Sequence, residues 1–320
     1  MRIQPLSHIP DADDLRATHE AIAPLIHRTP VLSSRSIDGI AGASLFFKCE
    51  NFQKIGAFKM RGASSAALRL TEAERSNGLA THSSGNHAQA VALSAKLLGV
   101  PAYIVMPETS PAIKIAATEG YGAHITFCAN NQKAREETLE KVVAETGATF
   151  IHPYNDYNVI AGQATAAKEL LEQAEGLDAV IAPVGGGGLM SGTALSTRYF
   201  APGVKVYGAE PREVDDAYRS FTSGRMQQNA SINTIADGLR TNLGEKTFGI
   251  IRQEVDAIFT VSEASIVDAM QLIWERMKII VEPSSAVPLA AILDNPAVFA
   301  GQRLGVILTG GNVDLGKLPF

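Results

Sequence analysis

The chain has 320 residues, of which 46% are hydrophobic, and a net charge of −5 without any run of like charges. A chain of this size buries a full core in one large domain or in two that share a site, and its charge excludes proteins built to bind nucleic acid or anionic membranes. No apolar run approaches the ~20 residues of a membrane span, and residues 1–14 carry acids and prolines, unlike a signal peptide. We therefore expect a cytoplasmic protein.

The two cysteines, Cys49 and Cys128, lie far apart in the sequence. They form no CxxC pair, so the sequence encodes neither a disulfide framework nor a zinc site. We predict that both are reduced and buried.

Short apolar runs alternate along the chain with amphipathic segments of helical length. The helical segments include residues 131–146, whose charges lie on one side, and residues 263–278, whose apolar stripe contains Ile266, Met270 and Ile273. The alternation predicts an α/β fold with parallel sheets covered by helices. We predict strands at residues 45–49, 102–106, 124–128, 149–152, 179–184, 204–209, 258–261 and 304–308.

The first segment that carries chemistry surrounds Lys59, which lies among Ala57, Phe58, Met60 and Gly62. Apolar surroundings disfavour the ammonium form, and a neutral amine is what attacks an aldehyde and holds it as a Schiff base. Taken alone, the segment also fits a lysine that extends from the first turn of a helix into solvent.

The next segment, residues 81–89, joins a strand to a helix. Its hydroxyl and amide side chains, on Ser83, Ser84 and Asn86, are groups that bind a carboxylate or a ring oxygen. His82 and His87 in the same segment have no spacing typical of transition-metal ligands, so we interpret them as structural groups or substrate neighbours.

Four consecutive glycines, Gly185 to Gly188, follow the predicted strand at 179–184 and precede a helical pattern from Thr193. Backbone N–H groups of such a loop converge on an anion at a helix N-terminus, which predicts a phosphate site. The loop lacks GxGxxG spacing and a following Lys-Ser/Thr, so a nucleotide site is disfavoured, and a flexible loop is the alternative. An amine, a phosphate site and a hydroxyl/amide loop are the groups that bind pyridoxal phosphate with an amino acid.

Together with Thr309-Gly310-Gly311-Asn312, these motifs resemble the fold-type II pyridoxal-phosphate enzymes, in particular the serine/threonine dehydratase and serine racemase branch. The resemblance covers nearly the whole chain. It implies a fold like that of the tryptophan synthase β-subunit, with two open parallel-sheet domains and the cofactor in the cleft between them. It also implies a discontinuous large domain of residues 1–69 and 151–320, a small domain of residues 70–150, and a homodimer. Because the chain stops at Phe320, we expect no C-terminal regulatory domain.

The resemblance also implies roles for individual residues, although Ala57 and Met60 depart from the residues common in related enzymes. Lys59 is the Schiff-base lysine and the base at the substrate α-carbon, Asn86 contacts the ring hydroxyl, and Thr309 faces the pyridine nitrogen. The implied cofactor-binding residues are Lys59, Phe58, Asn86, Gly185, Gly186, Gly187, Gly188, Leu189, Glu282 and Thr309. The implied substrate-binding residues are Ser83, Ser84, Gly85, Asn86, His87 and Arg135.

The neutral partner of the ring nitrogen, Thr309, points to the type of reaction. A hydroxyl leaves that nitrogen largely unprotonated, and the weaker electron sink favours prompt loss of a β-leaving group. We predict a lyase that eliminates water from serine, threonine or 3-hydroxyaspartate to give a 2-oxo acid and ammonia. The alternatives are a serine racemase with side dehydratase activity, a β-replacement enzyme of the cysteine synthase type, whose loop is instead TSGNTG-like, and a non-catalytic ligand-binding module.

Two further residues bear on the substrate. In the racemase branch the serine matching Ser84 is a second base on the face opposite Lys59, and a serine that only binds carboxylate is equally compatible with the sequence. Arg135 lies where related racemases and hydroxyaspartate dehydratases place an arginine that meets a second substrate carboxylate. A solvated helix charge is the alternative for Arg135.

A last constellation lies in residues 210–216. Glu210, the Val214 carbonyl and Asp216 are oxygen ligands spaced so that one turn offers all three to a hard divalent cation. The resemblance implies a structural Mg²⁺ or Ca²⁺ at this position, and an acidic surface turn is the alternative.

Overall fold

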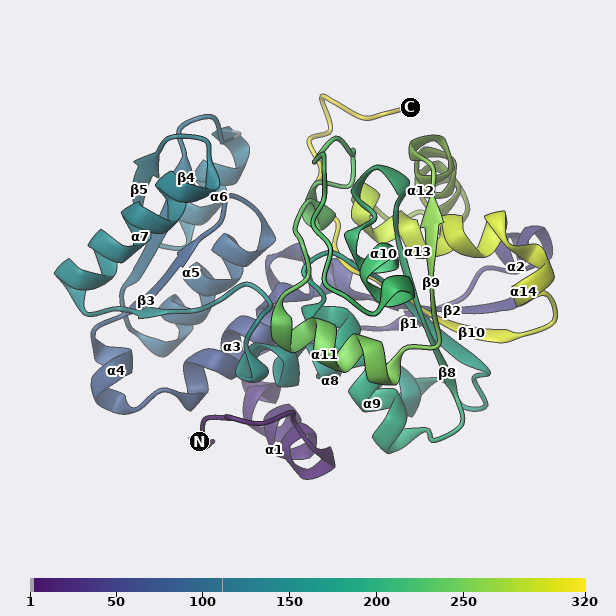
Figure 1. Cartoon of the computed structure of the whole chain (residues 1–320), viewed down its shortest axis with the longest axis horizontal. Helices are drawn as coiled ribbons and strands as arrows, with labels where there is room; N and C mark the ends of the chain where they lie inside the picture. Colours follow the sequence, from purple (N-terminus) through teal and green to yellow (C-terminus); the bar gives the residue numbers. More distant parts are fainter. Residues whose placement is uncertain (1–2, 111) are drawn as a thin grey trace.

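The computed structural model describes residues 3–110 and 112–320, and within them the strands form two sheets (Figure 1). A six-stranded sheet has the order β1-β2-β10-β7-β8-β9, and a four-stranded sheet has the order β5-β4-β3-β6. The strands are β1 (Val31–Leu32), β2 (Ser44–Cys49), β3 (Leu79–His82), β4 (Ala102–Pro107), β5 (His124–Cys128), β6 (Thr149–Phe150), β7 (Ala179–Pro183), β8 (Lys205–Pro211), β9 (Ala257–Val261) and β10 (Arg303–Leu308). Apart from the antiparallel pair of β1 and β2, these strands pair in parallel.

Helices connect and cover the strands, as the alternating sequence pattern predicts. They are α1 (Ala12–Ile22), α2 (Arg35–Ala41), α3 (Lys59–Arg69), α4 (Glu72–Ser76), α5 (Asn86–Leu98), α6 (Ala112–Gly120), α7 (Gln132–Thr146), α8 (Tyr157–Gln173), α9 (Gly188–Phe200), α10 (Asp216–Ser223), α11 (Glu245–Glu254), α12 (Glu263–Met277), α13 (Pro283–Asp294) and α14 (Pro296–Phe299). The predicted α/β class with parallel sheets is confirmed. Among the described residues, no helix is both long and apolar enough to cross a membrane.

Several predicted boundaries are corrected by the structure. The strand predicted at 149–152 ends at Phe150, and the one predicted at 204–209 continues to Pro211. The helix predicted from Thr193 begins at Gly188. The antiparallel edge strand β1 was not predicted, because two residues are too few for a periodic pattern.

The six-stranded sheet is buried on both faces, because successive residues of its central strands pack into different layers. Ala179 and Ile181 of β7 pack with α2, α12 and α13, whereas Val180 and Ala182 pack with α8, α9 and α11. Cys49 also lies in the first layer, and Cys128 lies in the core of the other sheet; both cysteines are free and buried, as predicted.

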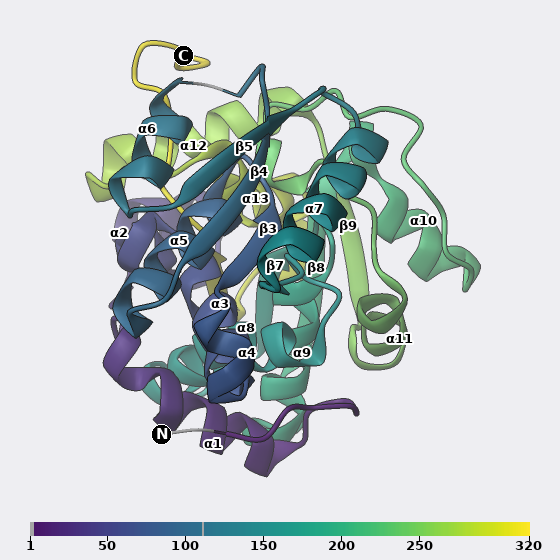
Figure 2. The ribbon, with the colours of Figure 1, turned by 90° about the vertical axis from the view of Figure 1, so that its left-hand side faces the viewer.

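The four-stranded sheet lies beside the larger one and faces the viewer in Figure 2. Leu79 and Ile104 pack with α3 and α5 on one face, and Ala80 and Val105 pack with α7 on the other. Its strands come from residues 79–150, inside the predicted small domain of residues 70–150. The exact domain boundaries stay a prediction.

The order of the strands brings distant segments to one edge of the large sheet. Leu308 at the end of β10 is paired with Cys49 at the end of β2, and β7 runs parallel on the other side of β10. Because the carboxyl ends of parallel neighbours meet at the same edge, residues 50–58, 184–188 and 309–312 lie together there.

Candidate active site

Lys59 is the first residue of α3 and follows directly from the segment at this edge. Its Nζ donates a hydrogen bond to the Pro153 carbonyl at 2.8 Å and lies 5.2 Å from the centre of the Phe58 ring. Burial lowers the pKa of Lys59 to about 8, and the nearby carboxylate of Glu282 opposes that shift. The direction agrees with the expectation from its apolar surroundings, and it makes a neutral amine accessible near physiological pH.

The backbone that leads into Lys59 is held in an unusual conformation. Ile55 and Gly56 have φ values of 60° and 71°, and this left-handed region is unfavourable for a β-branched residue. The conformation is fixed by Asn312, whose Nδ2 donates to the Ile55 carbonyl at 2.8 Å, and by the Phe58 N–H, which donates to the Thr309 carbonyl at 3.0 Å. The segment containing Lys59 is thereby attached to the segment after β10.

The tetraglycine loop, Gly185 to Gly188, follows β7 and ends as the first turn of α9. Gly187 has a φ of 87°, and no described residue accepts a hydrogen bond from the N–H groups of residues 185–188. Free N–H groups at the N-terminus of a 13-residue helix fit a phosphate.

Tyr154 explains why two of the four positions in this loop, Gly186 and Gly188, carry no side chain. A Cβ placed on Gly186 would lie 2.3 Å from the Tyr154 ring, and one on Gly188 would lie 3.0 Å from the Tyr154 Cβ. The ring of Tyr154 therefore covers one side of the loop. Sequence reasoning did not find Tyr154, because its contact is with residues more than thirty positions away.

Asn86, the first residue of α5, and Glu282, the residue before α13, lie together. The Nδ2 of Asn86 donates to both Glu282 oxygens at 3.0 and 3.1 Å, and its Oδ1 accepts from Asn312 at 2.8 Å. Burial raises the pKa of Glu282 to about 7, with a further contribution from Asp237, while the hydrogen bond from Asn86 opposes the rise. Glu282 is thus a buried carboxyl group that titrates near neutral pH.

Thr309 is buried at the end of β10, and its hydroxyl lies 3.0 Å from the hydroxyl of Ser285. Ser285 also donates to the Gly310 carbonyl at 2.6 Å and accepts from the Gly310 N–H at 2.8 Å. Ser285 therefore fixes the turn that orients Thr309. Its position three residues after Glu282 was the only sequence signal for it.

The loop after β3 is exposed enough to meet a ligand. The Ser83 hydroxyl accepts the Gly85 N–H at 3.3 Å, whereas the Ser84 hydroxyl has no hydrogen-bond partner among the described residues. His87 is buried, and its Nε2 donates to the Ile151 carbonyl at 2.9 Å. Burial and the charge of Lys59 lower the pKa of His87 well below its usual value, so the ring is neutral. Its other ring nitrogen, Nδ1, is buried without a partner among the described residues. A contact of His87 with the substrate stays a prediction.

Arg135 on α7 lies beside the start of the same loop. Its charge and that of Glu136 act in opposite directions on the pKa of His82, the residue before Ser83, and burial lowers that pKa. Its Nη2 donates to Asn130 at 3.1 Å, but its Nε is buried without an acceptor among the described residues. Arg135 therefore has donor capacity that the protein leaves unused.

His152, which the sequence pattern indicates as a structural group, also lies on this side of the site. Its Nδ1 accepts the N–H groups of Tyr154 and Asn155 at 3.1 and 2.8 Å, so any ring proton lies on Nε2. Burial, with smaller contributions from His82 and Lys59, lowers its pKa to about 4. A neutral imidazole with a fixed tautomer is the result.

Glu210 and Asp216 form a second group near this edge of the sheet, with Val214 between them in the sequence. Each of the two acids is 1% exposed, and neither forms an ion pair with a described residue. The oxygens of Glu210 accept two backbone N–H groups of α10, and those of Asp216 accept from Asn229 and from the Leu243 N–H. Burial raises the pKa of Glu210 well above its usual value and that of Asp216 to about 6, and the Asp216 charge raises that of Glu210 further. Two buried carboxylates without a cation fit a site for a hard divalent ion.

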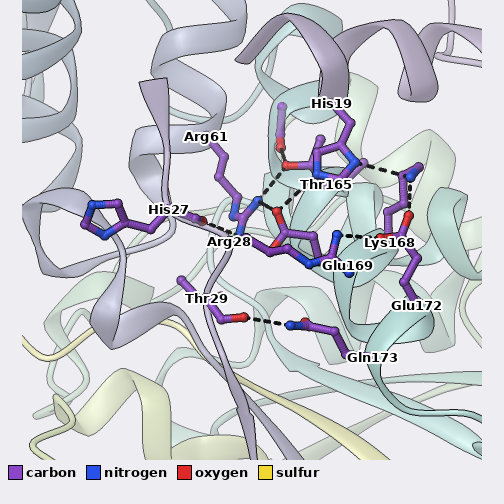
Figure 3. Close-up of polar contacts among 12 residues, drawn as sticks. His19, His27, Arg28, Thr29, Arg61, Thr165, Lys168, Glu169, Glu172 and Gln173 are labelled. Carbon is purple, nitrogen blue, oxygen red and sulfur yellow. Dashed lines mark hydrogen bonds and ion pairs between the residues drawn. The ribbon is translucent and has the colours of Figure 1, made fainter. Parts of the chain in front are cut away.

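Behind Lys59, α3 is anchored by a buried charge network around Arg61 (Figure 3). The guanidinium of Arg61 donates to both oxygens of Glu50 at 2.7 and 2.8 Å, to both oxygens of Glu169 at 2.9 and 2.8 Å, and to Thr165 at 3.0 Å. Lys48 donates to Glu169 at 2.6 Å. A surface cavity of about 390 Å³ beside this network, between α1, α8 and α9, contains none of the predicted site residues.

The comparisons with known proteins agree with the groups at this edge. A family model described as pyridoxal-phosphate dependent enzyme matches residues 22–310. The chain belongs to this family. Lys59, the free N–H groups of the tetraglycine loop, Asn86 and Thr309 are the residues that fit the cofactor.

Three relatives place the chain more closely within the family. It is 53% identical over 313 residues to a beta-hydroxyaspartate dehydratase of Paracoccus denitrificans, covering 98% of this chain and 99% of the relative. It is 48% identical to an L-threo-3-hydroxyaspartate ammonia-lyase of Saccharomyces cerevisiae, covering 96% and 95%. A crystal structure of serine racemase from Dictyostelium discoideum is 48% identical and superposes with a TM-score of 0.91, covering 95% of this chain and 99% of that one.

These findings confirm the fold-type II architecture and the dehydratase and racemase branch. The protein is an enzyme of the ammonia-lyase type with racemases among its near relatives, and its cofactor is pyridoxal phosphate.

Proposed function

We propose that the protein is a pyridoxal-phosphate-dependent ammonia-lyase that removes water from 3-hydroxyaspartate, with serine and threonine as weaker substrates. The observation that carries the choice of 3-hydroxyaspartate is the buried Nε of Arg135, which has no acceptor among the described residues. Leaving such a donor unpaired costs about 1–3 kcal/mol, and a second substrate carboxylate would provide the acceptor. The 53% identical relative is consistent with this choice.

The residues of the chain divide the reaction between them. The bound cofactor supplies the electron sink for the electron pair left at the α-carbon. Lys59 would hold the cofactor in the resting enzyme, and its amine would accept the α-proton of the bound substrate; a pKa of about 8 suits an amine that accepts and returns protons near neutral pH. The β-hydroxyl would leave as water with the proton that Lys59 accepted from the α-carbon. The released enamine tautomerises to an imine, and water hydrolyses it to the 2-oxo acid and ammonia.

Substrate preference tests the role of Arg135. Arg135→Gln should lower kcat/KM for 3-hydroxyaspartate about 100-fold and change that for serine by less than about threefold, because only the first substrate has a β-carboxylate. Release of the 2-oxo acid measures both reactions. Lys133→Gln, which removes an exposed charge from the same helix, is the matched control. Equal losses for the two substrates would contradict a contact with the second carboxylate.

Reaction type is tested by a separate assay. L-serine, L-threonine and the 3-hydroxyaspartates should yield 2-oxo acids, while O-acetylserine with sulfide should yield little cysteine. Activity in the sulfide reaction alone would support the β-replacement alternative.

Racemisation of serine is the second candidate activity, favoured by the unpartnered hydroxyl of Ser84 and the racemase relatives. If Ser84 is the second base, Ser84→Ala should abolish interconversion of L- and D-serine but retain elimination from the substrate enantiomer whose proton Lys59 removes. If Ser84 only binds the carboxylate, both activities should fall together through a higher KM. D-serine formation faster than 2-oxo acid release in the parent enzyme would make racemisation the main activity.

We also propose a structural Mg²⁺ or Ca²⁺ held by Glu210, the Val214 carbonyl and Asp216, a homodimer, and a cytoplasmic location. The two buried carboxylates without a counter-ion support the cation site. Light scattering of the purified protein measures the oligomeric state, and a monomer at micromolar concentration would contradict the dimer.

A further inference from the structure

One ion pair joins the part of the chain around the four-stranded sheet to the rest of the molecule, among the residues that the structure describes. Lys114 on α6 lies 2.5 Å from Asp237, the first residue of a single 3₁₀ turn (Asp237–Leu239) that precedes α11. The two side chains are 22% and 41% exposed, so solvent screens their attraction only in part. We call this contact the inter-sheet ion pair.

The turn that contains Asp237 lies between the tetraglycine loop and the start of α13. A Cβ on Gly185 would lie 3.0 Å from the Leu239 Cα and 3.2 Å from the Gly238 carbonyl oxygen. On the other side, the Gly238 N–H donates to the Ser284 hydroxyl at 3.1 Å, two residues after Glu282. The inter-sheet ion pair therefore attaches α6 to a turn that touches both the tetraglycine loop and the start of α13.

Glu282 is exposed to the charges of both members of this pair. Asp237 disfavours its ionised form and Lys114 favours it. The other groups that face Glu282 are Asn86 from α5, the Asn312 N–H from the segment after β10, and Lys59 from α3, and all three favour its ionised form. Among the described residues, Asp237 is the acid whose charge raises the pKa of Glu282, and Lys114 forms an ion pair with Asp237.

We propose that Lys114 and Asp237 are positioning residues, which hold α6 against the turn beside the tetraglycine loop and set the charge that Glu282 presents to Lys59 and the bound cofactor. The inference deepens the proposed function, because it assigns a control of the same site to residues outside it. Lys114 opposes the effect of Asp237, so Glu282 is ionised to a greater extent than it would be beside Asp237 alone.

Single substitutions of the two residues have effects of opposite sign under this proposal. Lys114→Met leaves Asp237 unopposed, so the pKa of Glu282 rises above its value of about 7. Asp237→Asn leaves Lys114 unopposed, so the pKa falls. The double variant should give a pKa between those of the two single variants, because it removes both charges. An ion pair that only stabilises the fold would instead make both single variants change in the same direction.

The visible absorbance of the holoenzyme, followed against pH without substrate, reads out this effect. Glu282 favours a protonated nitrogen on Lys59, so the midpoint of the absorbance change follows the charge of Glu282. The midpoint should move by about half a pH unit or more in opposite directions in Lys114→Met and Asp237→Asn, and the midpoint of the double variant should lie between the two. Lys114→Arg, which keeps the charge, should match the parent.

Two controls make the outcome specific. Lys133→Met breaks the exposed ion pair with Glu137 on α7 and should leave the midpoint unchanged. In a Glu282→Gln background, neither Lys114→Met nor Asp237→Asn should move it, because both act through Glu282. Shifts of the same sign, no shift, or shifts that persist without Glu282 would each overturn the proposal. The titration requires bound cofactor and no turnover, so its result is independent of which substrate the enzyme uses.

Discussion

Two pairs of carboxylates are buried in this molecule, and they differ in what neutralises them. Glu50 and Glu169 lie behind Lys59 and are bonded to Arg61 and Lys48, whose charges balance theirs. Burial alone would raise the pKa of Glu169, but hydrogen bonds from His19 and Arg61 hold it well below its usual range.

Glu210 and Asp216 are as deeply buried, but they accept hydrogen bonds from neutral groups alone among the described residues. Burial raises the pKa of both. Burial therefore does not by itself decide the charge of a carboxylate. Glu50 and Glu169 are neutralised by the side chains of Arg61 and Lys48. Glu210 and Asp216 have no such cationic partner among the described residues, so they are suited to bind a metal cation from solution.

The largest expected effect comes from removing the central cation of the first pair. Arg61→Met leaves Glu50 and Glu169 buried with Lys48 as their remaining cation, and should lower the free energy of unfolding by about 3–5 kcal/mol. Urea unfolding measures the loss. Arg198→Met, which breaks an exposed pair with Glu254, should cost less than about 1 kcal/mol. A loss as small as that of the control would mean that Arg61 does not neutralise the network.

The second pair should respond to an added cation. Mg²⁺ or Ca²⁺ at about 100 times its dissociation constant should raise the free energy of unfolding by about 2.7 kcal/mol, because the ion binds the folded state. Calorimetric melting with and without chelator measures the rise, and Asp216→Ala should abolish it. An unchanged melting temperature in the parent protein would leave the pair an acidic turn.

The smallest effect is a difference in pH dependence without added cation. The folded-state pKa of Asp216, about 6, lies above its unfolded value, so the folded protein binds this proton more tightly. The free energy of unfolding should therefore gain a contribution of about 1–2 kcal/mol as the pH falls from about 6 to about 4. Comparing Asp216→Asn with the parent isolates this gain, because the variant lacks the titrating group.

Glu169 contributes to the pH dependence of the free energy of unfolding with the opposite sign. Its folded-state pKa lies below the usual value, so its contribution to stability is present above the unfolded pKa and is lost only as the pH falls through the lower folded value. A parent protein that loses stability between pH 6 and 4 by the same amount as Asp216→Asn would contradict the assignment of the raised pKa to Asp216.

The sequence predicts those residues of the site that belong to short contiguous motifs. Lys59, the loop at 83–87, the glycines at 185–188 and Thr309 each lie in a short pattern with its own chemistry, and parallel-strand topology explains why they meet. The pairing of Arg61 with Glu169, the packing of Tyr154 on Gly186 and the inter-sheet ion pair were not predicted. Each joins residues far apart in the chain, and no local pattern specifies the partner.

The start of α9 shows why a local rule fails under close packing. The sequence predicts a helical pattern from Thr193, yet the helix begins at Gly188. A Cβ on Gly192 would lie 2.5 Å from the Ala164 backbone nitrogen, because α9 packs directly against α8. The close contact between α8 and α9 therefore requires glycine within α9, although glycine has a low intrinsic helix propensity.

The place of β10 in the large sheet has a consequence for how the protein is made. It is the last strand along the described chain, yet it lies between β2 and β7 and is the one strand that joins β1 and β2 to the remainder of that sheet. During synthesis, the edge of β2 that pairs with β10 stays unpaired until residues 303–308 leave the ribosome. The strands of the four-stranded sheet, in contrast, are all available once residue 150 has emerged. The amine-bearing segment and the phosphate loop are therefore brought together only after β10 has emerged, and a nascent chain stalled before β10 should not retain the cofactor.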